Sequence, residues 1–343
     1  MLKITCEGVY YKNGGFVPAK DGPAAGLPAP EKAREGTMAH AILKAHNTGD
    51  NMEELAIRFD AMASHDITYV GIIQTARASG MQAFPLPYVL TNCHNSLCAV
   101  GGTINEDDHV FGLSAAKKYG GEFVPAHQSV IHSYMRERYA APGRMILGSD
   151  SHTRYGAYGT MAIGEGGPEL ARQLLSKTYN IPYPKLIAIY LTGTPIPGVG
   201  PQDVALELIR STFKDGVVKN AVMEFFGPGV ANLSMDYRSG IDVMTTETTC
   251  LSSIWPADHT LKAHLAVLGR GEAFKPQAPA DGAYYDGLIE VELDKIRPMI
   301  ALPFHPSNAY TIQEFQENLD ELLHQVDEDT VRQLKLKNRP ASL

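Results

Sequence analysis

Short apolar runs that alternate with helical segments constrain the fold of this chain more than any other feature. Met145 to Leu147, Leu186 to Leu191 and Ala221 to Phe226 are short runs that suit buried strands. Glycine-containing turns follow the last two runs, and helical patterns come next, at residues 201–209 and 230–243. This alternation favours an α/β fold with mainly parallel sheets flanked by helices.

Further elements can be placed along the chain by the spacing of apolar residues. Helices are indicated at residues 38–43, 52–62, 110–119 and 130–138, whereas residues 69–76 are apolar without a decisive period. The glycines and prolines of the first 35 or so residues predict an irregular arm over the surface. Thr311 and Glu314 form a capping box ahead of an apolar helical stripe from Ile312 to Val326, which needs a partner surface. We expect two related α/β domains, residues 1–195 and 196–305, and a C-terminal amphipathic helix and tail, residues 306–343.

Composition excludes several classes of protein. The formal net charge of −8 argues against nucleic acid as a ligand, because a phosphate-binding surface normally shows a basic excess. No apolar stretch approaches the roughly 20 residues of a membrane-spanning helix, and no early segment resembles a signal peptide. We therefore expect a cytoplasmic protein that does not enter a membrane. The cysteines are scattered without a C-x-x-C motif, which indicates reduced thiols: Cys6, Cys93, Cys98 and Cys250.

The six residues from Gly148 to Thr153 carry the clearest chemical signal. They end the apolar run at Leu147 and place Asp150 and His152 two residues apart, before a glycine-rich loop. A carboxylate can fix the tautomer of an imidazole and raise its basicity, so this pair suits proton transfer. An ordinary turn, in which Asp150 and Ser151 cap backbone amides, explains the same residues locally.

Other ionisable residues lie where strands or helices are expected to end. His94 follows a strand interrupted by prolines, His132 lies on a helix, and Glu247 lies in a hydroxyl-rich stretch. Each of them alone would suit a structural histidine or a solvated carboxylate. The glycine loop from Gly164 to Glu169 matches no phosphate-binding motif, and we interpret it as a tight strand-to-helix turn.

The order and spacing of these residues resemble the large catalytic segment of the aconitase and isopropylmalate isomerase family. The likeness is closest from Val130-Ile-His132 through Pro142-Gly143 to Gly148-Ser-Asp-Ser-His-Thr153 and Gly159. It continues through Gly227-Pro-Gly-Val230 and Glu247 to Pro256, and covers roughly residues 65 to 310. The Asp-Ser-His-Thr element is specific for the family, and the other matches support it.

This resemblance implies a hydro-lyase that dehydrates and rehydrates a hydroxy-polycarboxylate. Hydroxide is a poor leaving group, so the reaction needs a Lewis acid and a proton donor, and the family supplies one iron of a [4Fe-4S] cluster held by three cysteines. By position, Asp150 and His132 would protonate the departing hydroxyl, with the carboxylate keeping the imidazole protonated. His152 and Glu247 would lie close to the iron-bound water. Three further residues would line the same site: His94 in the ring of acid–base groups, and Ser151 and Gln74 as substrate contacts.

Departures from the family pattern limit what this chain can do alone. Cys93 stands where the family has an aspartate, and Val70 stands where a glutamine is expected, with Gln74 one turn away. The resemblance places the cluster cysteines, the serine base and most substrate-binding arginines in further C-terminal domains or a separate small subunit. None of the four cysteines falls at a cluster position, and we interpret Cys250 as structural, so no residue of this chain is assigned as a metal ligand.

Two alternatives stay open. The scaffold could be a non-catalytic carboxylate-binding or regulatory module. It could also be a hydratase that uses a simple divalent metal through His94, His132 and His152.

Overall fold

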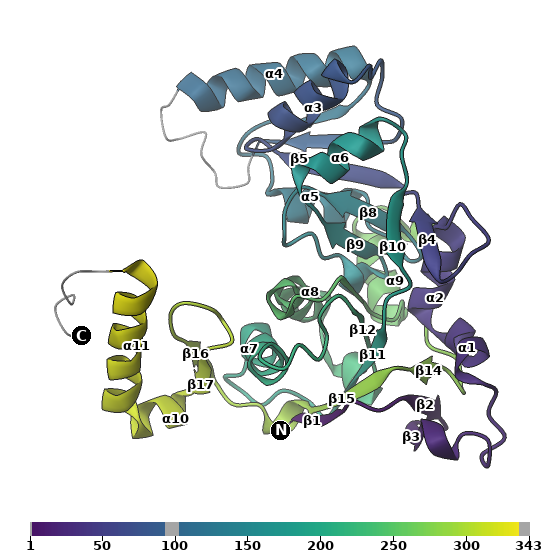
Figure 1. Ribbon diagram of the computed structural model, residues 1–343, viewed down its shortest axis with the longest axis vertical. Coiled ribbons are helices and arrows are strands. Elements are labelled where there is room, and N and C mark those ends of the chain that lie inside the picture. The colour runs from purple at the N-terminus through teal and green to yellow at the C-terminus, as the bar shows by residue number, and fades with distance from the viewer. Residues whose placement is uncertain (1, 93–102, 336–343) are drawn as a thin grey trace.

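Two five-stranded sheets flanked by helices form the body of the molecule (Figure 1). The computed structural model describes residues 2–92 and 103–335. Most neighbouring strands in both sheets run parallel, which confirms the α/β class predicted from the strand–helix alternation. The division into domains at residues 195 and 305 stays a prediction.

The first sheet is entirely parallel and has the strand order β7, β6, β5, β8, β9. Met62 and Leu147 pack in one hydrophobic cluster with α3, α4 and α6, whereas Ala63 and Ile146 face α5, as the two-residue period of a strand requires. The elements are β5 (Ala61–His65), α3 (Tyr69–Ala78), β6 (Tyr88–Thr91), α4 (Thr103–Tyr119), β7 (Glu122–Val124), α5 (Ile131–Arg138), β8 (Met145–Gly148), β9 (Met161–Gly164) and α6 (Gly167–Leu174).

The second sheet has the strand order β1, β15, β11, β12, β13, and only β1 is antiparallel to its neighbour. Ile189 and Phe225 pack against α7, α8 and α9 on one face, while Ala188 and Val222 pack toward α2 (Met38–His46) on the other. The elements are β1 (Leu2–Thr5), β11 (Leu186–Thr192), α7 (Pro201–Thr212), β12 (Val222–Phe226), α8 (Met235–Met244), β13 (Ser252–Ile254), α9 (His259–Val267) and β15 (Gly287–Glu292).

The N-terminal segment, expected to be irregular, contains regular structure. β1 joins the second sheet, and β2 and β3 form a hairpin whose turn residues Asn13 and Gly14 both have positive φ angles, 52° and 77°. An Asn-Gly pair favours such a turn because both residues tolerate this conformation. The remaining elements of this region are β2 (Val9–Lys12), β3 (Gly15–Pro18), α1 (Pro30–Ala33), α2 (Met38–His46) and β14 (Tyr284–Tyr285).

A buried carboxylate ties α2 to the second sheet. Glu224 of β12 is fully buried and accepts hydrogen bonds from the backbone amides of Met38 and Ala39, at 3.1 and 2.9 Å. The Tyr285 hydroxyl donates a third bond at 2.6 Å. The first amides of a helix lack partners within the helix, so an acceptor at this end satisfies them. Burial nevertheless raises the pKa of Glu224.

The helix predicted at residues 52–62 is wrong. β4 (Glu54–Ile57) pairs with β10 (Tyr179–Pro182), and β5 begins at Ala61. Leu55 and Ile57 are buried and alternate with more exposed neighbours, which is the period of a strand. The helical spacing of the apolar residues here is a coincidence that pairing with a distant strand overrides.

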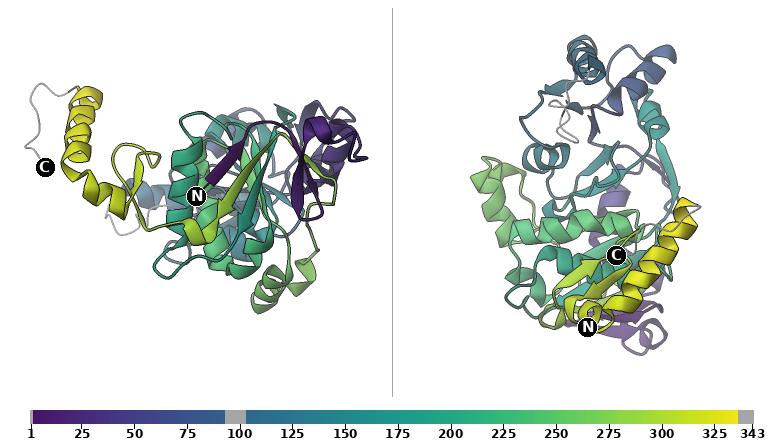
Figure 2. Two further views of the ribbon diagram at one scale, coloured as in Figure 1. Left: turned by 90° about the horizontal axis from the view of Figure 1, so that it is seen from below. Right: turned by 90° about the vertical axis from the view of Figure 1, so that its left-hand side faces the viewer.

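The C-terminal segment stands away from both sheets (Figures 1 and 2). Its predicted capping box is confirmed, because the side chains of Thr311 and Glu314 each accept from the other's backbone amide. The predicted helix is interrupted at Asn318, and within this segment Val326 is buried. The elements are β16 (Met299–Ala301), β17 (Ala309–Thr311), α10 (Ile312–Glu317) and α11 (Leu319–Leu334). In the described part of the chain, no helix combines the length and apolarity needed to cross a membrane.

Candidate active site

The loop that follows β8 gathers ionisable side chains at the carboxyl edge of the first sheet. Asp150 lies on this loop, His65 ends the neighbouring strand β5, and His132 comes from the first turn of α5. The carboxyl edge of a parallel sheet is the usual place for a ligand site, because loops from several strands meet there.

Asp150 is the centre of this cluster. It is 7% exposed, and its Oδ1 atom accepts from the backbone amide of His152 at 2.8 Å and lies 2.9 Å from Nε2 of His132. Its Oδ2 atom lies 3.7 Å from Nε2 of His65. The carboxylate therefore has imidazoles on both of its oxygens.

The hydrogen bonds of His132 indicate which of its nitrogens carries the proton. Its Nε2 atom faces Asp150, and its Nδ1 atom lies 3.3 Å from the hydroxyl oxygen of Tyr155. A carboxylate can only accept, so the neutral ring places its proton on Nε2. Burial raises the pKa of Tyr155, so its hydroxyl keeps its proton and can donate to Nδ1.

Burial lowers the pKa of His132, although the hydrogen bond and charge of Asp150 act in the opposite direction. The role implied by the resemblance, in which the carboxylate keeps the imidazole protonated until the C–O bond breaks, stays a prediction. The resemblance implied that the two groups share a site, whereas the loss of solvent around the ring follows from the packing of α5.

We predict that His132 makes the fold less stable at mildly acidic pH. Its native pKa lies below the ordinary 6.5, so the unfolded chain takes up this proton first. The free energy of unfolding therefore falls as the pH drops through 6.5, and this contribution stops falling below the native pKa. His132→Gln can still donate to Asp150 and should remove this part of the fall. Urea unfolding between about pH 8 and pH 5 measures it.

The matched control is His324→Gln on α11, where the imidazole is largely exposed. Burial lowers the pKa of His40, whereas the hydrogen bond that His46 donates to Asp60 helps to raise the pKa of His46 against the effect of burial. His40 and His46 are present in the wild type and in both variants, so their contributions to the pH dependence of stability cancel in the comparison. Equal pH dependence of stability in the wild type and His132→Gln would contradict the prediction.

His152 joins Asp150 to a second carboxylate on another element. Its Nε2 atom lies 3.1 Å from Oε1 of Glu247, which is on the 3₁₀ turn η6 (Thr245–Thr248) after α8. Its Nδ1 atom lies 3.2 Å from the Ser151 hydroxyl and 3.7 Å from Oδ1 of Asp150. The Thr246 hydroxyl donates to the backbone carbonyl of Ser151 at 2.5 Å, so the two loops are also bonded directly.

The structure thus brings together four of the residues singled out in the sequence: His132, Asp150, His152 and Glu247. Ser151 lies beside them, while Gln74 is exposed on α3 and no hydrogen bond or ion pair joins it to the cluster among the described residues. His94 and Cys93 lie outside the described residues. The roles of all these residues stay predictions.

Sequence reasoning missed two histidines that border the cluster. His65 contacts Asp150, and His305 contacts Glu247 with its Nε2 atom 3.7 Å from Oε2. His65 is the last residue of β5. The helix wrongly predicted at residues 52–62 overlaps the start of this strand, so the strand and the histidine at its end were not recognised. His305 comes from the loop between β16 and β17, about 60 residues after Glu247, and no local pattern marks it.

Gly164 lets β9 approach the Asp150 loop closely. A Cβ atom at this position would lie 2.3 Å from the backbone oxygen of Asp150 and 3.1 Å from Cα of Ser151. The predicted strand-to-helix turn is confirmed, since β9 ends at Gly164 and α6 begins at Gly167.

We predict that Gly164→Ala destabilises the protein by about 1–3 kcal/mol, because backbone atoms must move to accept the methyl group. Gly166→Ala is the control, since a Cβ there would lie 3.7 Å from Pro168 Cδ and meet no closer atom. Urea unfolding compares the two variants. Equal loss in both would show that the close approach at Gly164 carries no cost.

The described residues do not fit a three-cysteine cluster site. Cys6 is exposed, whereas Cys250 is buried with its thiol donating to the Thr245 carbonyl at 3.3 Å. Across residues 2–92 and 103–335, no group of three or more His, Cys, Asp or Glu is arranged to hold a metal ion. The divalent-metal alternative depends on His94 and therefore stays untested.

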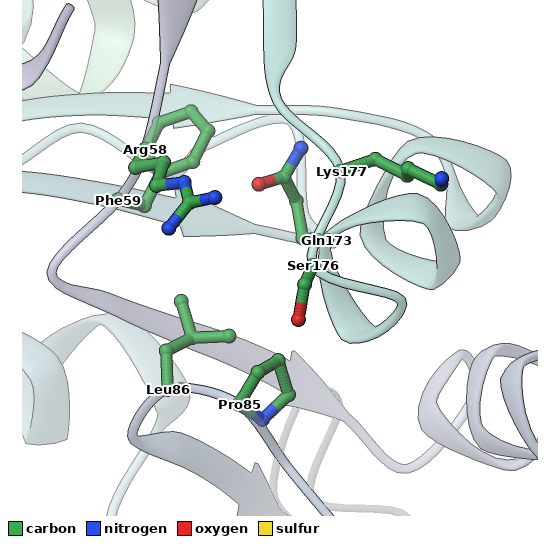
Figure 3. Close-up of a pocket in the computed structure, with 7 residues that line it drawn as sticks. All are labelled: Arg58, Phe59, Pro85, Leu86, Gln173, Ser176 and Lys177. Atoms are coloured by element: carbon green, nitrogen blue, oxygen red, sulfur yellow. The ribbon is translucent and has the colours of Figure 1, made fainter. Parts of the chain in front are cut away.

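A cavity of about 130 Å³ lies at the opposite edge of the first sheet, where β5 and β6 begin. Arg58 and Gln173 face each other across it, Pro85 and Leu86 line another side, and Lys177 points away (Figure 3). None of its lining residues belongs to the acid–base cluster. The chemistry of the cluster therefore locates the candidate site, and this cavity does not.

Parallel sheets with a cluster of two carboxylates and their imidazoles at one carboxyl edge define an α/β protein with a largely buried acid–base site. A sequence model of the aconitase family (aconitate hydratase) matches residues 40–342, and the chain belongs to this family.

Curated relatives show the same likeness. A mitochondrial aconitate hydratase of Schizosaccharomyces pombe is 32% identical over 281 residues, covering 77% of this chain and 35% of the relative. That of Saccharomyces cerevisiae is 30% identical and covers 83% and 40%, respectively. An aconitase–ribosomal protein bL21m fusion of S. pombe is 32% identical and covers 63% and 25%. The chain thus spans about a quarter to two fifths of the length of these relatives.

These relatives correct the expected cytoplasmic location. The aconitate hydratases similar to this chain from S. pombe, Caenorhabditis elegans and S. cerevisiae are named as mitochondrial proteins. The expectation rested on the lack of a recognisable targeting segment in the sequence, and such a lack does not decide a location.

Proposed function

We propose that this chain forms one wall of the active site of an aconitase-type hydro-lyase that acts on a small hydroxy-polycarboxylate. The contact that carries the proposal is the 2.9 Å approach of His132 to Asp150 at the carboxyl edge of the sheet. A carboxylate that accepts from an imidazole and a backbone amide while largely shielded from water suits a proton donor for a leaving hydroxyl.

The pair acts as an acid in one direction and as a base in the other. After taking up one proton, Asp150 and His132 share it between carboxylate and imidazole. The proton passes to the departing hydroxyl, which leaves as water, and the pair returns to a carboxylate beside a neutral imidazole. In the hydration direction the same pair removes a proton from the attacking water.

His152 and Glu247 form the more accessible part of the site. The exposed fraction of the His152 side chain is 39%, and that of Glu247 is 25%, so both are more accessible than Asp150. We propose that Ser151, on the same exposed loop, contacts a substrate carboxylate.

The family's [4Fe-4S] cluster and the base that removes the carbon-bound proton would come from a polypeptide segment outside this chain. The two described cysteines lie apart and do not form a cluster site, and the chain matches only part of its relatives. Such a segment could be a further domain or a separate subunit.

The proposal is tested by purifying the tagged chain anaerobically from its own cells and assaying the material for hydration of cis-aconitate. Activity should accompany a polypeptide that carries three cluster cysteines, identified by mass spectrometry, and should be lost in Asp150→Asn. Iron and sulfide should stay far below one cluster per chain when the isolated chain is reconstituted. Stoichiometric cluster in the isolated chain would contradict the assignment of the ligands.

Tight citrate binding by the chain alone, without turnover in any complex, would favour a non-catalytic carboxylate-binding module instead. The paired carboxylates and imidazoles support the catalytic reading, because a binding module for anions does not need two buried or half-buried carboxylates at its site.

A further inference from the structure

Glu247 has a second imidazole partner that comes from the C-terminal part of the chain. His305 lies in the loop between β16 and β17, and its Nε2 atom is 3.7 Å from Oε2 of Glu247. The other carboxylate oxygen, Oε1, lies 3.1 Å from Nε2 of His152. The carboxylate therefore lies between two imidazoles from separate segments.

The surroundings of His305 fix both its tautomer and its ring plane. The backbone amide of Ser307 donates to Nδ1 at 3.1 Å, so Nδ1 accepts and the neutral ring carries its proton on Nε2, the atom that faces Glu247. The ring also stacks on Phe213, with centroids 3.9 Å apart and planes at 26°. The hydrogen bond at Nδ1 and the stacking on Phe213 together restrict the rotation of the His305 ring.

We infer that His305 is a positioning residue for Glu247 in the proposed hydro-lyase site, so the inference rests on the proposed function. At 3.7 Å the contact between His305 Nε2 and Oε2 is too long for a hydrogen bond, so His305 attracts this oxygen electrostatically, while the other oxygen is directed at His152. Glu247 is partly exposed on a single turn of 3₁₀ helix, where a carboxylate with one partner would be free to rotate. Through Glu247, His305 sets the orientation of His152 beside Asp150.

Two substitutions separate this role from simple packing. His305→Phe keeps a ring that can stack on Phe213 but removes the N–H group. His305→Gln loses the ring but keeps an amide N–H in the position of Nε2. His324→Phe, on the exposed face of α11, is the control for introducing a phenylalanine.

The measurement is the pair of imidazole ¹⁵N chemical shifts of His152 in the full chain, recorded at fixed pH by NMR. We expect His305→Phe to move these shifts in the same direction as Glu247→Gln, while His305→Gln and His324→Phe leave them near the wild-type values. Unchanged His152 shifts in His305→Phe, or equal changes in His305→Phe and His305→Gln, would overturn the inference.

This readout needs no substrate and no turnover. If no complex containing the chain hydrates cis-aconitate but the His152 shifts respond as expected, the proposed function fails while the positioning contact stands. If turnover is found and His152 does not respond, the positioning role fails alone.

Discussion

Asp150→Asn is expected to lower the turnover of the assembled hydro-lyase by roughly 10²–10⁴-fold, the usual contribution of a positioned acid–base group. The amide can keep the hydrogen bond that Asp150 Oδ1 accepts from the His152 backbone amide at 2.8 Å. The same amide oxygen can also accept from Nε2 of His132, as Oδ1 does at 2.9 Å, while the NH₂ group replaces the oxygen that lies 3.7 Å from His65 and cannot accept. The geometry around His132 is therefore largely kept, but the negative charge is lost, and the amide cannot share a proton with the imidazole.

The measurement is the rate of cis-aconitate hydration by the purified complex, with urea unfolding of the chain as a check on folding. Asp60→Asn is the matched control, because Asp60 also pairs with an imidazole, His46 at 2.9 Å, but lies before the opposite end of β5. That variant should keep its activity. A stable Asp150→Asn complex with turnover within tenfold of the wild type would exclude Asp150 from the proton transfer.

The α/β class was predictable because strands such as β11 and β12 are buried on both faces. Such strands appear in a sequence as continuous apolar runs, as at Leu186 to Leu191. β4 was missed because it is short and half-exposed, and its strand character depends on pairing with β10, more than 100 residues later. The β2–β3 hairpin was signalled by Asn13-Gly14, but the surrounding glycines and prolines outweighed that local pattern.

The candidate site was predictable to the extent that the family motif marks it. His132, Asp150, His152 and Glu247 converge although they come from three separate segments, and the motif spacing indicated this. The effect of burial on His132 could not be read from the sequence, since it depends on how α5 packs against the first sheet. His305 depends on the path of the C-terminal segment, which no local pattern encodes.

Asp242→Leu is expected to reduce the free energy of unfolding by about 3 kcal/mol or more, because three buried neutral donors lose their acceptor at about 1–3 kcal/mol each. Asp242 lies on α8, is fully buried, and accepts from Ser253 at 2.6 Å and from the Trp255 indole at 2.9 Å. Its other oxygen accepts from the backbone amide of Ala157 at 3.3 Å. Burial raises the pKa of Asp242, and the hydrogen bonds from the three donors act in the opposite direction.

These donors belong to both sheets, so the loss of the Asp242 carboxylate should also loosen the segment that carries the Asp150 loop. Ala157 follows the Asp150 loop of the first sheet, whereas Ser253 belongs to β13 of the second sheet. Leucine would leave the donors without an acceptor. Asn at the same position keeps an acceptor for Ser253 and Trp255 and loses only the bond to Ala157, so Asp242→Asn should cost about 1–3 kcal/mol.

Urea unfolding of the two variants beside Asp236→Leu, an exposed position on the same helix, measures the difference. Asp236→Leu should cost less than about 1 kcal/mol, since it loses only a favourable charge at the helix N-terminus. If Asp242→Leu unfolds at the wild-type urea concentration, the buried carboxylate does not hold the two sheets together. A loss of unfolding free energy that increases from Asp236→Leu through Asp242→Asn to Asp242→Leu would instead show that the hydrogen bonds of Asp242 connect the two sheets. Because these bonds lie next to the Asp150 loop, they would then also help to hold the acid–base cluster in place.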